Sequence, residues 1–244
     1  MRRILPNTLT TPAWSPDGKW IAFSRNAQIY IMPFDGSTFD TSALIQLTSE
    51  GRNFFPSWSP DGRSIAYNES ICNENIDCGI WIHNLENDES QFIAKYGNYP
   101  SWHPRSDSLV YLSNTIDENG VDIGDSLWQY SIPDQNKYLL KTISEPYYEN
   151  RDLKISSDGT KVALISTLSS GGSGQLYTIN LNDFEFYKLT SEGCQGFSWS
   201  PEGKIVYVNH DYSGLDEEKG TLWIMNNDGT GKRQLTFNNF EIIQ

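Results

Sequence analysis

Side chains that could carry catalysis are few and scattered in this chain of 244 residues. Its three histidines, His83, His103 and His210, lack the short spacing that a zinc site needs. The cluster Gly172-Ser173-Gly174 lies between predicted strands and is not the Gly-x-Ser-x-Gly of a nucleophile elbow. We find no nucleophile with a paired base and no phosphate-binding glycine loop. We therefore predict a non-catalytic chain, although a pair of carboxylates on separate loops stays open as an alternative.

An acidic stretch around residue 120 resembles a calcium-binding loop. Asp117, Asp122 and Asp125 surround two glycines, and carboxylate oxygens are the ligands that calcium prefers. The stretch lacks the order of acidic residues and the final glutamate of a calcium loop. We expect no cofactor, with calcium at these three aspartates as the weaker alternative to a solvated acidic hairpin.

Two of the three cysteines are candidates for a disulfide. Cys72 and Cys78 stand six residues apart in one predicted loop, whereas Cys194 stands alone. A bond between the first two would fix that loop and would imply an oxidising compartment. Two free thiols are the alternative.

A short phrase recurs five times and organises the whole chain. The steps between the first residues of successive copies are 44, 44, 53 and 44. Such a period indicates a series of similar supersecondary units. The copies are Trp14-Ser15-Pro16-Asp17-Gly18, Trp58-Ser59-Pro60-Asp61-Gly62, Trp102-His103-Pro104-Arg105-Ser106, Ile155-Ser156-Ser157-Asp158-Gly159 and Trp199-Ser200-Pro201-Glu202-Gly203.

The phrase has the chemistry of a tight turn between two antiparallel strands. Serine opens the turn, proline sets φ at its second position, and the final glycine supplies a left-handed residue. Short strand-like runs flank each copy, and no stretch has the period of a helix. Four short strands in each unit predict an all-β propeller of five four-stranded antiparallel blades, with six blades as the alternative. We expect the tryptophans that begin the phrases to pack between neighbouring blades.

The repeat resembles the WD40-like repeat of the TolB family. Matching residues are 12–23 in the first unit, 56–67 in the second, and 199–207 with 222–236 in the fifth. The third and fourth units lose the glycine or the tryptophan, which puts their turns in doubt. The resemblance implies a propeller, often extracytoplasmic or periplasmic in bacteria, that binds proteins. Similar repeats accompany prolyl oligopeptidase-like peptidases and sugar-active lyases.

We expect residues 1–244 to form one propeller domain without the N-terminal domain of TolB. No signal peptide is evident at the N-terminus, so a cytoplasmic module of a larger protein is the alternative location. We predict blades at about 12–48, 56–94, 99–142, 152–190 and 196–236, with the termini closing the ring.

Charge and hydropathy narrow the choice of partner. The formal net charge of −13 disfavours nucleic acid and anionic lipid. No apolar run approaches the roughly 20 residues that span a membrane. We predict a protein or peptide partner, basic in character.

The loops predict where that partner binds. The phrase turns are short and uniform, whereas the loops at the opposite ends of the strands vary and carry acidic and aromatic residues. The candidate binding residues are Phe54, Tyr96, Tyr99, Tyr147, Tyr148, Arg151 and Tyr212. The simpler alternative is that these side chains only pack the connections. A propeller hydrolase or lyase, a carbohydrate-binding module, or a sensor module of a larger protein are the alternative functions.

Overall fold

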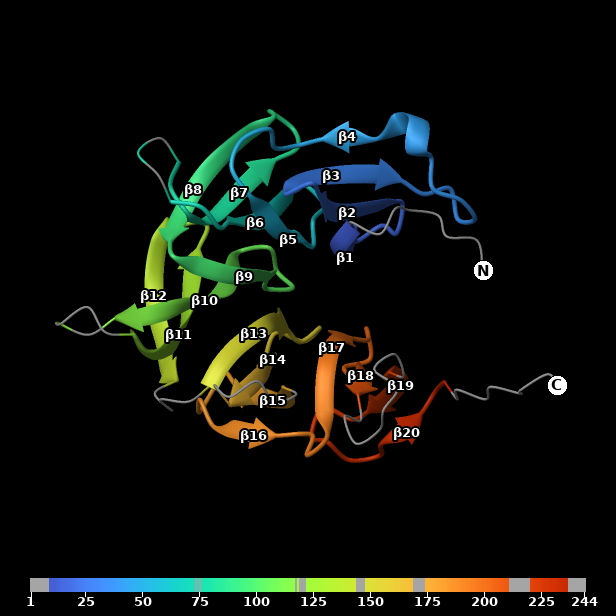
Figure 1. Cartoon of the computed structure of the whole chain (residues 1–244), viewed down its shortest axis with the longest axis vertical. Coiled ribbons are helices and arrows are strands. Elements are labelled where there is room, and N and C mark those ends of the chain that lie inside the picture. Colours follow the sequence, from blue (N-terminus) through green and yellow to red (C-terminus); the bar gives the residue numbers. More distant parts are fainter. Residues whose placement is uncertain are drawn as a thin grey trace. The chain divides into compact units, whose positions relative to one another are not determined.

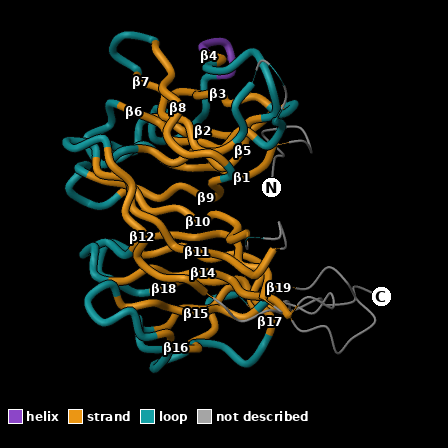
Figure 2. Tube along the Cα trace, turned by 90° about the vertical axis from the view of Figure 1, so that its left-hand side faces the viewer, coloured by secondary structure: helices purple, strands orange, loops and turns teal. Residues whose placement is uncertain are grey.

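The computed structural model describes residues 9–72, 74, 76–116, 118, 122–143, 148–168, 174–210 and 220–236. These residues form five four-stranded antiparallel sheets, each built from four consecutive strands. Figure 2 shows strands over most of the described trace, with helix confined to one turn beside β4. The prediction of an all-β propeller with five four-stranded blades is confirmed.

The strands of each blade follow one another along the chain (Figure 1). Blade 1 contains β1 (Leu9–Trp14), β2 (Trp20–Arg25), β3 (Gln28–Pro33), the 3-10 helix η1 (Thr41–Ala43) and β4 (Ile45–Gln46). Blade 2 contains β5 (Asn53–Trp58), β6 (Ser64–Glu69), β7 (Gly79–Asn84) and β8 (Glu89–Lys95). Blade 3 contains β9 (Gly97–Trp102), β10 (Ser108–Ile116), β11 (Asp122–Ser131) and β12 (Asn136–Ile143). Blade 4 contains β13 (Tyr148–Ile155), β14 (Lys161–Leu168), β15 (Gln175–Asn180) and β16 (Phe186–Lys188). Blade 5 contains β17 (Gly193–Trp199), β18 (Ile205–His210), β19 (Gly220–Met225) and β20 (Arg233–Gln234).

The chain divides into two compact units. The first unit is residues 1–114 with 126–139, and the second is residues 115–125 with 140–244. Within the first unit β1 lies against β5 and β5 against β9, and within the second β13 lies against β17. The first strand of each of these blades therefore faces the first strand of its neighbour.

Four strands run further than the sequence pattern predicted. In blade 3, β10 continues to Ile116 and β11 begins at Asp122, so residues 114–116 and 122–125 belong to strands. Likewise β14 continues to Leu168 and pairs there with Tyr148, so that β13 begins before the predicted start at 152. Thr115, Ile116, Ile123 and Thr167 are β-branched and favour this continued pairing.

The phrase turns keep their geometry even where the sequence has degraded. The fifth phrase residue has a left-handed φ in every copy, from +60° at Ser106 to +75° at Gly62. In the fourth copy the Ser156 hydroxyl donates to Asp158 Oδ1 at 2.6 Å, as Ser15 does to Asp17 in the first. These hydroxyl bonds, followed by backbone N–H bonds from Thr160 and Lys19, lower the pKa of Asp158 and Asp17. The doubt about the turns of the third and fourth units is therefore removed.

Indole N–H groups tie neighbouring blades together. Trp58 Nε1 donates to Ala13 O at 3.1 Å, Trp102 Nε1 to Ser57 O at 3.1 Å, and Trp199 Nε1 to Lys154 O at 3.0 Å. Each bond therefore reaches the residue before the phrase in the preceding blade. Trp14 instead packs against Phe34 and Phe39 of its own blade and is 51% exposed.

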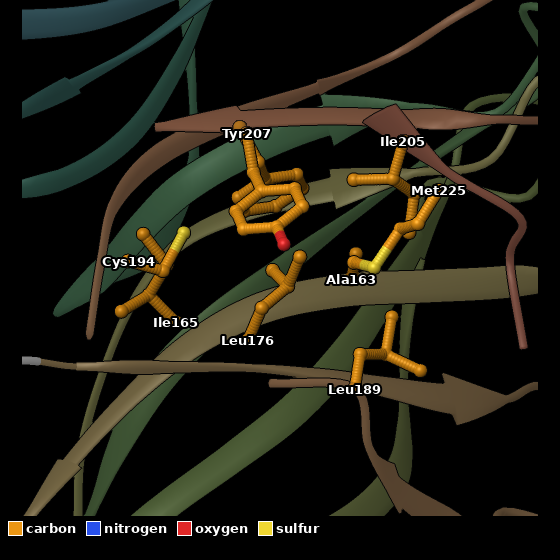
Figure 3. Packing of buried hydrophobic residues seen from close by; sticks show 9 residues of the cluster. Ala163, Ile165, Leu176, Leu189, Cys194, Ile205, Tyr207 and Met225 are labelled. Carbon is orange, nitrogen blue, oxygen red and sulfur yellow. The ribbon is translucent and has the colours of Figure 1, made fainter. Parts of the chain in front are cut away.

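Apolar side chains fill the space between the blades of each unit. In the second unit, Ala163 and Leu176 of blade 4 point toward Tyr207, Ile205 and Met225 of blade 5 (Figure 3). In the first unit a similar cluster joins Ile80 of blade 2 to Trp102 and Tyr111 of blade 3. Burial of this apolar surface is what holds adjacent sheets together.

We expect Trp102→Phe to lower the free energy of unfolding by about 1–2 kcal/mol, because it removes the bond to Ser57 O while keeping an aromatic ring. Trp102→Ala should cost about 3–5 kcal/mol, since the side chain is only 7% exposed. Urea denaturation followed by circular dichroism measures both. Trp14→Phe is the control and should cost less than about 0.5 kcal/mol, as expected at an exposed site. Equal losses for Trp14→Phe and Trp102→Phe would contradict the role of the indole bond.

Candidate functional site

A β-bulge interrupts the first strand of every blade at the same place. The register with the second strand shifts across the residues two and three positions before the last residue of the first strand in blades 1 to 4, and three and four positions before it in blade 5. In four blades the bulge holds a non-glycine residue in the left-handed region, with φ between +53° and +55°; these residues are Thr11, Phe55, Tyr99 and Asp152. The bulge of blade 5 contains Gly196. Such a bulge bends the strand and re-aims the side chains beside it.

Two of the bulge residues bring aromatic rings together in the first unit. The rings of Phe55 and Tyr99 lie 4.6 Å apart between centroids, and Phe54 lies 6.4 Å from Phe55. The Phe55 N–H donates to Thr11 Oγ1 at 3.3 Å, which connects the bulges of blades 1 and 2. We call Phe54, Phe55 and Tyr99 the aromatic cluster; all three are half-buried.

Two cations lie over aromatic rings of blade 2, and one of these rings belongs to the aromatic cluster. The Arg52 guanidinium lies 5.8 Å from the centroid of the Phe54 ring. The Lys95 ammonium lies 4.9 Å from the ring centroid of Tyr96, which is 51% exposed and precedes Tyr99 by three residues. These two ring faces already have cationic neighbours, so an incoming lysine or arginine would compete with them.

Two buried polar residues of β6 pair with the start of β5, the strand that carries Phe54 and Phe55. Glu69 is 3% exposed, and its carboxylate accepts hydrogen bonds from the backbone N–H groups of Arg52 and Ile71 at 2.7–2.8 Å. Asn68 is 2% exposed and donates to Asn98 Oδ1 at 3.0 Å, while its own Oδ1 has no hydrogen-bond partner. Glu69 therefore stabilises the connection between blades 1 and 2.

The predicted binding residues are only partly brought together. Phe54 and Tyr99 belong to the aromatic cluster, and Tyr96 is near it in the chain. Arg151 lies on β13 in the second unit, where its Nε is buried without a hydrogen-bond partner. Tyr148 begins β13, and its side chain is not described; Tyr147 and Tyr212 lie outside the described residues.

Sequence reasoning missed Phe55, which makes the central contact of the aromatic cluster. Aligning the five phrases would have drawn attention to it. Thr11, Phe55 and Tyr99 each stand directly before a proline and three residues before the phrase tryptophan. The position recurs at the same distance from the phrase in these three blades, whereas the side chain that occupies it differs.

The second unit has its own polar groups at the bulge. Lys154 Nζ lies 3.3 Å from Asp152 Oδ1, donates to Phe197 O and sits 4.9 Å from the centroid of the Phe197 ring. Asp125 Oδ2 accepts from the Asn150 side chain at 2.8 Å. Asp125 thus supports β13, while the side chain of Asp122 and all of Asp117 lie outside the described residues. Calcium at this stretch stays a prediction.

The remaining candidate groups have clear positions. The structure joins Cys72 and Cys78 in a disulfide, with their Cα atoms 4.6 Å apart, and Cys194 is buried. His103 Nδ1 accepts from the backbone N–H of Arg105 at 3.3 Å and so helps to hold the third phrase turn. Over the described part of the chain, no three His, Cys, Asp or Glu side chains cluster as metal ligands. No helix in the described residues is long and apolar enough to cross a membrane.

Comparison with known proteins gives matches only among solved structures; no family model and no curated protein matches the chain. TolB from Acinetobacter baumannii is 24% identical, with a TM-score of 0.69 over 91% of this chain and 52% of that one. A TolB candidate from Agrobacterium tumefaciens is 19% identical, with a TM-score of 0.72 over 95% of this chain and 82% of that one. The chain has the TolB-type β-propeller fold.

Enzymes share this fold. An oligogalacturonate lyase in complex with manganese is 13% identical, with a TM-score of 0.64 over 96% of this chain and 67% of that one. The chain spans about half the length of the Acinetobacter TolB. At these identities the likeness establishes the architecture, and function must be argued from the side chains.

Substitution of Gly51 tests the role of the buried Glu69 carboxylate. Gly51 and Gly18 have nearly equal φ values of +70° and +69°, but only a Cβ at Gly51 would clash, and it would clash with the Glu69 carboxylate. We expect Gly18→Ala to cost about 1–2 kcal/mol in free energy of unfolding, from left-handed strain alone. Gly51→Ala should cost about 1–3 kcal/mol more, because Glu69 must leave its two N–H donors. If Gly51→Ala and Gly18→Ala lowered the free energy of unfolding equally in urea denaturation, Glu69 would be free to move aside.

Alkylation tests the disulfide that we propose for the protein in solution. Burial raises the pKa of the Cys194 thiol to about 12, so iodoacetamide should label no cysteine in the folded protein. Denaturation without reductant should give one label per chain, at Cys194, and reduction should give labels at all three cysteines. Mass spectrometry counts the labels. Three labels without reductant would exclude the bond between Cys72 and Cys78.

Proposed function

We propose that this chain is a propeller interaction module whose aromatic cluster holds an extended segment of a protein partner. The observation that carries the proposal is the contact of Phe55 with Tyr99, two left-handed bulge residues on adjacent blades.

Comparison of the bulge residues in the different blades shows which of their features the fold requires. The bulge itself occurs in all five blades, so it belongs to the fold. Blade 1 uses Thr11 there and blade 4 uses Asp152, so the fold does not require aromatic side chains. Phe55 and Tyr99 therefore need another reason for being aromatic, and partner recognition supplies one.

The surroundings of the aromatic cluster match a protein interface. Half-buried aromatic residues at the centre and charged residues at the rim are typical of binding hot spots. Arg52 lies over the Phe54 ring and is exposed, so it supplies such a charged rim. Binding of a segment there would cover the rings and exclude water from them. TolB proteins have the same fold, which is consistent with an interaction module.

The charge of the chain sets the character of the partner. We propose a segment with an apolar residue for the aromatic cluster, on a partner whose wider surface is basic. The net charge of −13 attracts such a partner at long range, whereas Arg52 and Lys95 disfavour a cation on the rings themselves. The alternatives remain a lyase-like or carbohydrate-binding propeller, since an oligogalacturonate lyase shares the fold, and a module of a larger protein.

Affinity capture with the native host lysate, followed by titration of the captured protein, tests the proposal. Phe55→Thr and Tyr99→Thr introduce the residue that blade 1 carries at this position, so the bulge should be retained. Each should weaken binding at least tenfold, because loss of a hot-spot residue costs about 2 kcal/mol or more. Tyr96→Ala should weaken binding by less.

Tyr187→Ala is the matched control, because Tyr187 is 51% exposed, as Tyr96 is, but lies on β16. It should leave the affinity unchanged. Undiminished affinity of the Phe55→Thr and Tyr99→Thr variants would refute the site. Capture of saccharides instead of a protein would favour the alternative.

A further inference from the structure

A cavity of about 420 Å³ lies between blades 2 and 3, within the first unit. This volume is within the range of small-molecule sites. Blade 2 contributes Ser64, Ile82 and Gln91 to the wall, and blade 3 contributes Trp102 and Ile132. No residue of the aromatic cluster lines the cavity, so it is a candidate site separate from the proposed binding surface for a protein partner.

Ser64 is equivalent to Trp20 in blade 1 and to Lys161 in blade 4. Each is the first residue of the second strand of its blade, and each donates its backbone N–H to the hydroxyl of the phrase serine at 2.9–3.0 Å. Blades 1, 2 and 4 are each followed by another blade of the same unit. The side chain at this position can therefore be compared across three contacts between blades.

The other two blades fill the space that Ser64 leaves open. The Trp20 indole packs between blades 1 and 2, against apolar residues of both blades that include Ile31. The Lys161 ammonium reaches blade 5, where Nζ donates to Asn227 Oδ1 at 3.0 Å. A serine has neither the ring of tryptophan nor the reach of lysine, and the cavity lies at the corresponding place between blades 2 and 3.

The wall on blade 3 repeats the apolar groups that pack with Trp20 on blade 2. Trp102 is the phrase tryptophan equivalent to Trp58. Ile132 is equivalent to Leu85, since the backbone N–H of each donates to the carbonyl just before the second strand of its blade. Trp58 and Leu85 pack against the same apolar cluster as Trp20, whereas Trp102 and Ile132 line the cavity. The cavity therefore offers a planar apolar ring surroundings like those of the Trp20 indole.

Polar groups of the wall favour a cation over an anion. Glu89 lines the cavity, and Asn87 Nδ2 donates to its Oε2 at 3.0 Å, which leaves Oε1 for a ligand. Of the described residues, no lysine or arginine lines the cavity. Tyr130 also lines it and is only 6% exposed. Burial raises the pKa of Tyr130, so its hydroxyl stays neutral and can donate a hydrogen bond to a ligand.

We propose that this cavity binds a small arylalkylamine, a planar aromatic ring with a short chain that ends in an ammonium group. The ring packs against Ile82 and Ile132, as the Trp20 indole packs in blade 1, and the ammonium lies near the Glu89 carboxylate. Such a ligand combines the two groups with which the sister blades fill this space, the indole of Trp20 and the ammonium of Lys161. Burial of the ring supplies most of the affinity, and charge selects among ligands that share the ring.

Titration with tryptamine, followed through the methyl NMR signals of isotope-labelled isoleucines, tests the proposal. The ring current of the bound indole should shift the Ile82 and Ile132 signals, with a Kd of about 1 mM or lower, as expected for a ligand of this size. Ile31 is the internal control, because it has the register position of Ile82 in blade 1, where Trp20 already fills the space. The Ile31 signal should not move.

Two further ligands separate the contributions of the ring and of the charge. Indole-3-propionate has the ring of tryptamine with a negative charge, and it should bind about fivefold more weakly or less tightly still. Butylamine has the ammonium without the ring, and it should bind at least about tenfold more weakly.

Ser64→Trp is the decisive variant, because it places the residue of blade 1 in blade 2. It should abolish the tryptamine-dependent shift at Ile132 and should keep or raise the melting temperature, since it fills a cavity. Ile82→Thr introduces the residue that blade 4 carries as Thr178 in the same register, and it should weaken tryptamine binding about threefold or more.

Glu89→Gln should reduce the preference for tryptamine over indole-3-propionate about threefold, because it removes the carboxylate from the wall. Glu86→Gln is the matched control and should keep the preference, since Glu86 pairs with Arg63 and does not line the cavity. Isoleucine signals that tryptamine leaves unmoved, shifts that persist in the folded Ser64→Trp variant, or an unchanged affinity of Ile82→Thr would overturn the proposal. Equal binding of butylamine and tryptamine, or tighter binding of glucose, would also overturn it.

Discussion

An indole N–H that reaches the main chain of the preceding blade is the contact on which the arrangement of the blades depends. It fixes the spacing between the first strands of blades 1 and 2, 2 and 3, and 4 and 5. A blade has two apolar faces and cannot bury them alone, so it needs this alignment with a neighbour. The fourth phrase begins with Ile155, whose side chain cannot donate such a bond.

Alignment by tryptophan leaves the bulge residues free to vary. Each bulge residue has its conformation within the first strand of the blade, and it stands three residues before the phrase. Side chains at the bulge can therefore change without loss of the blade. The same reasoning applies at the third strand, where methionine and isoleucine in three blades become histidine in blade 2. In a repeat protein the sister blades act as internal controls, and a side chain that differs between them at one position is not required by the fold.

Much of the fold was predictable because its signals are local. The turn chemistry of Ser15 to Gly18 and the alternation of the flanking strands depend on a few neighbouring residues. The pairing of His83 with Ser90 and of Phe55 with Tyr99 was not predictable, because it depends on register between strands and between blades. The lengths of β10 and β14 were missed for the same reason, since pairing with a neighbouring strand decides where a strand ends. Of the predicted site, Phe54 and Tyr99 are together, whereas Arg151 belongs to the second unit.

Amide hydrogen exchange of the complex with its captured partner tests the central claim, that side chains free to vary at the bulges form the binding site. The account predicts that binding slows exchange in β5 and β9 around Phe55 and Tyr99, and leaves the phrase turns at Ser59 to Gly62 and His103 to Ser106 unchanged. Slower exchange confined to the phrase turns would contradict it, because the uniform part of the repeat would then be the binding surface.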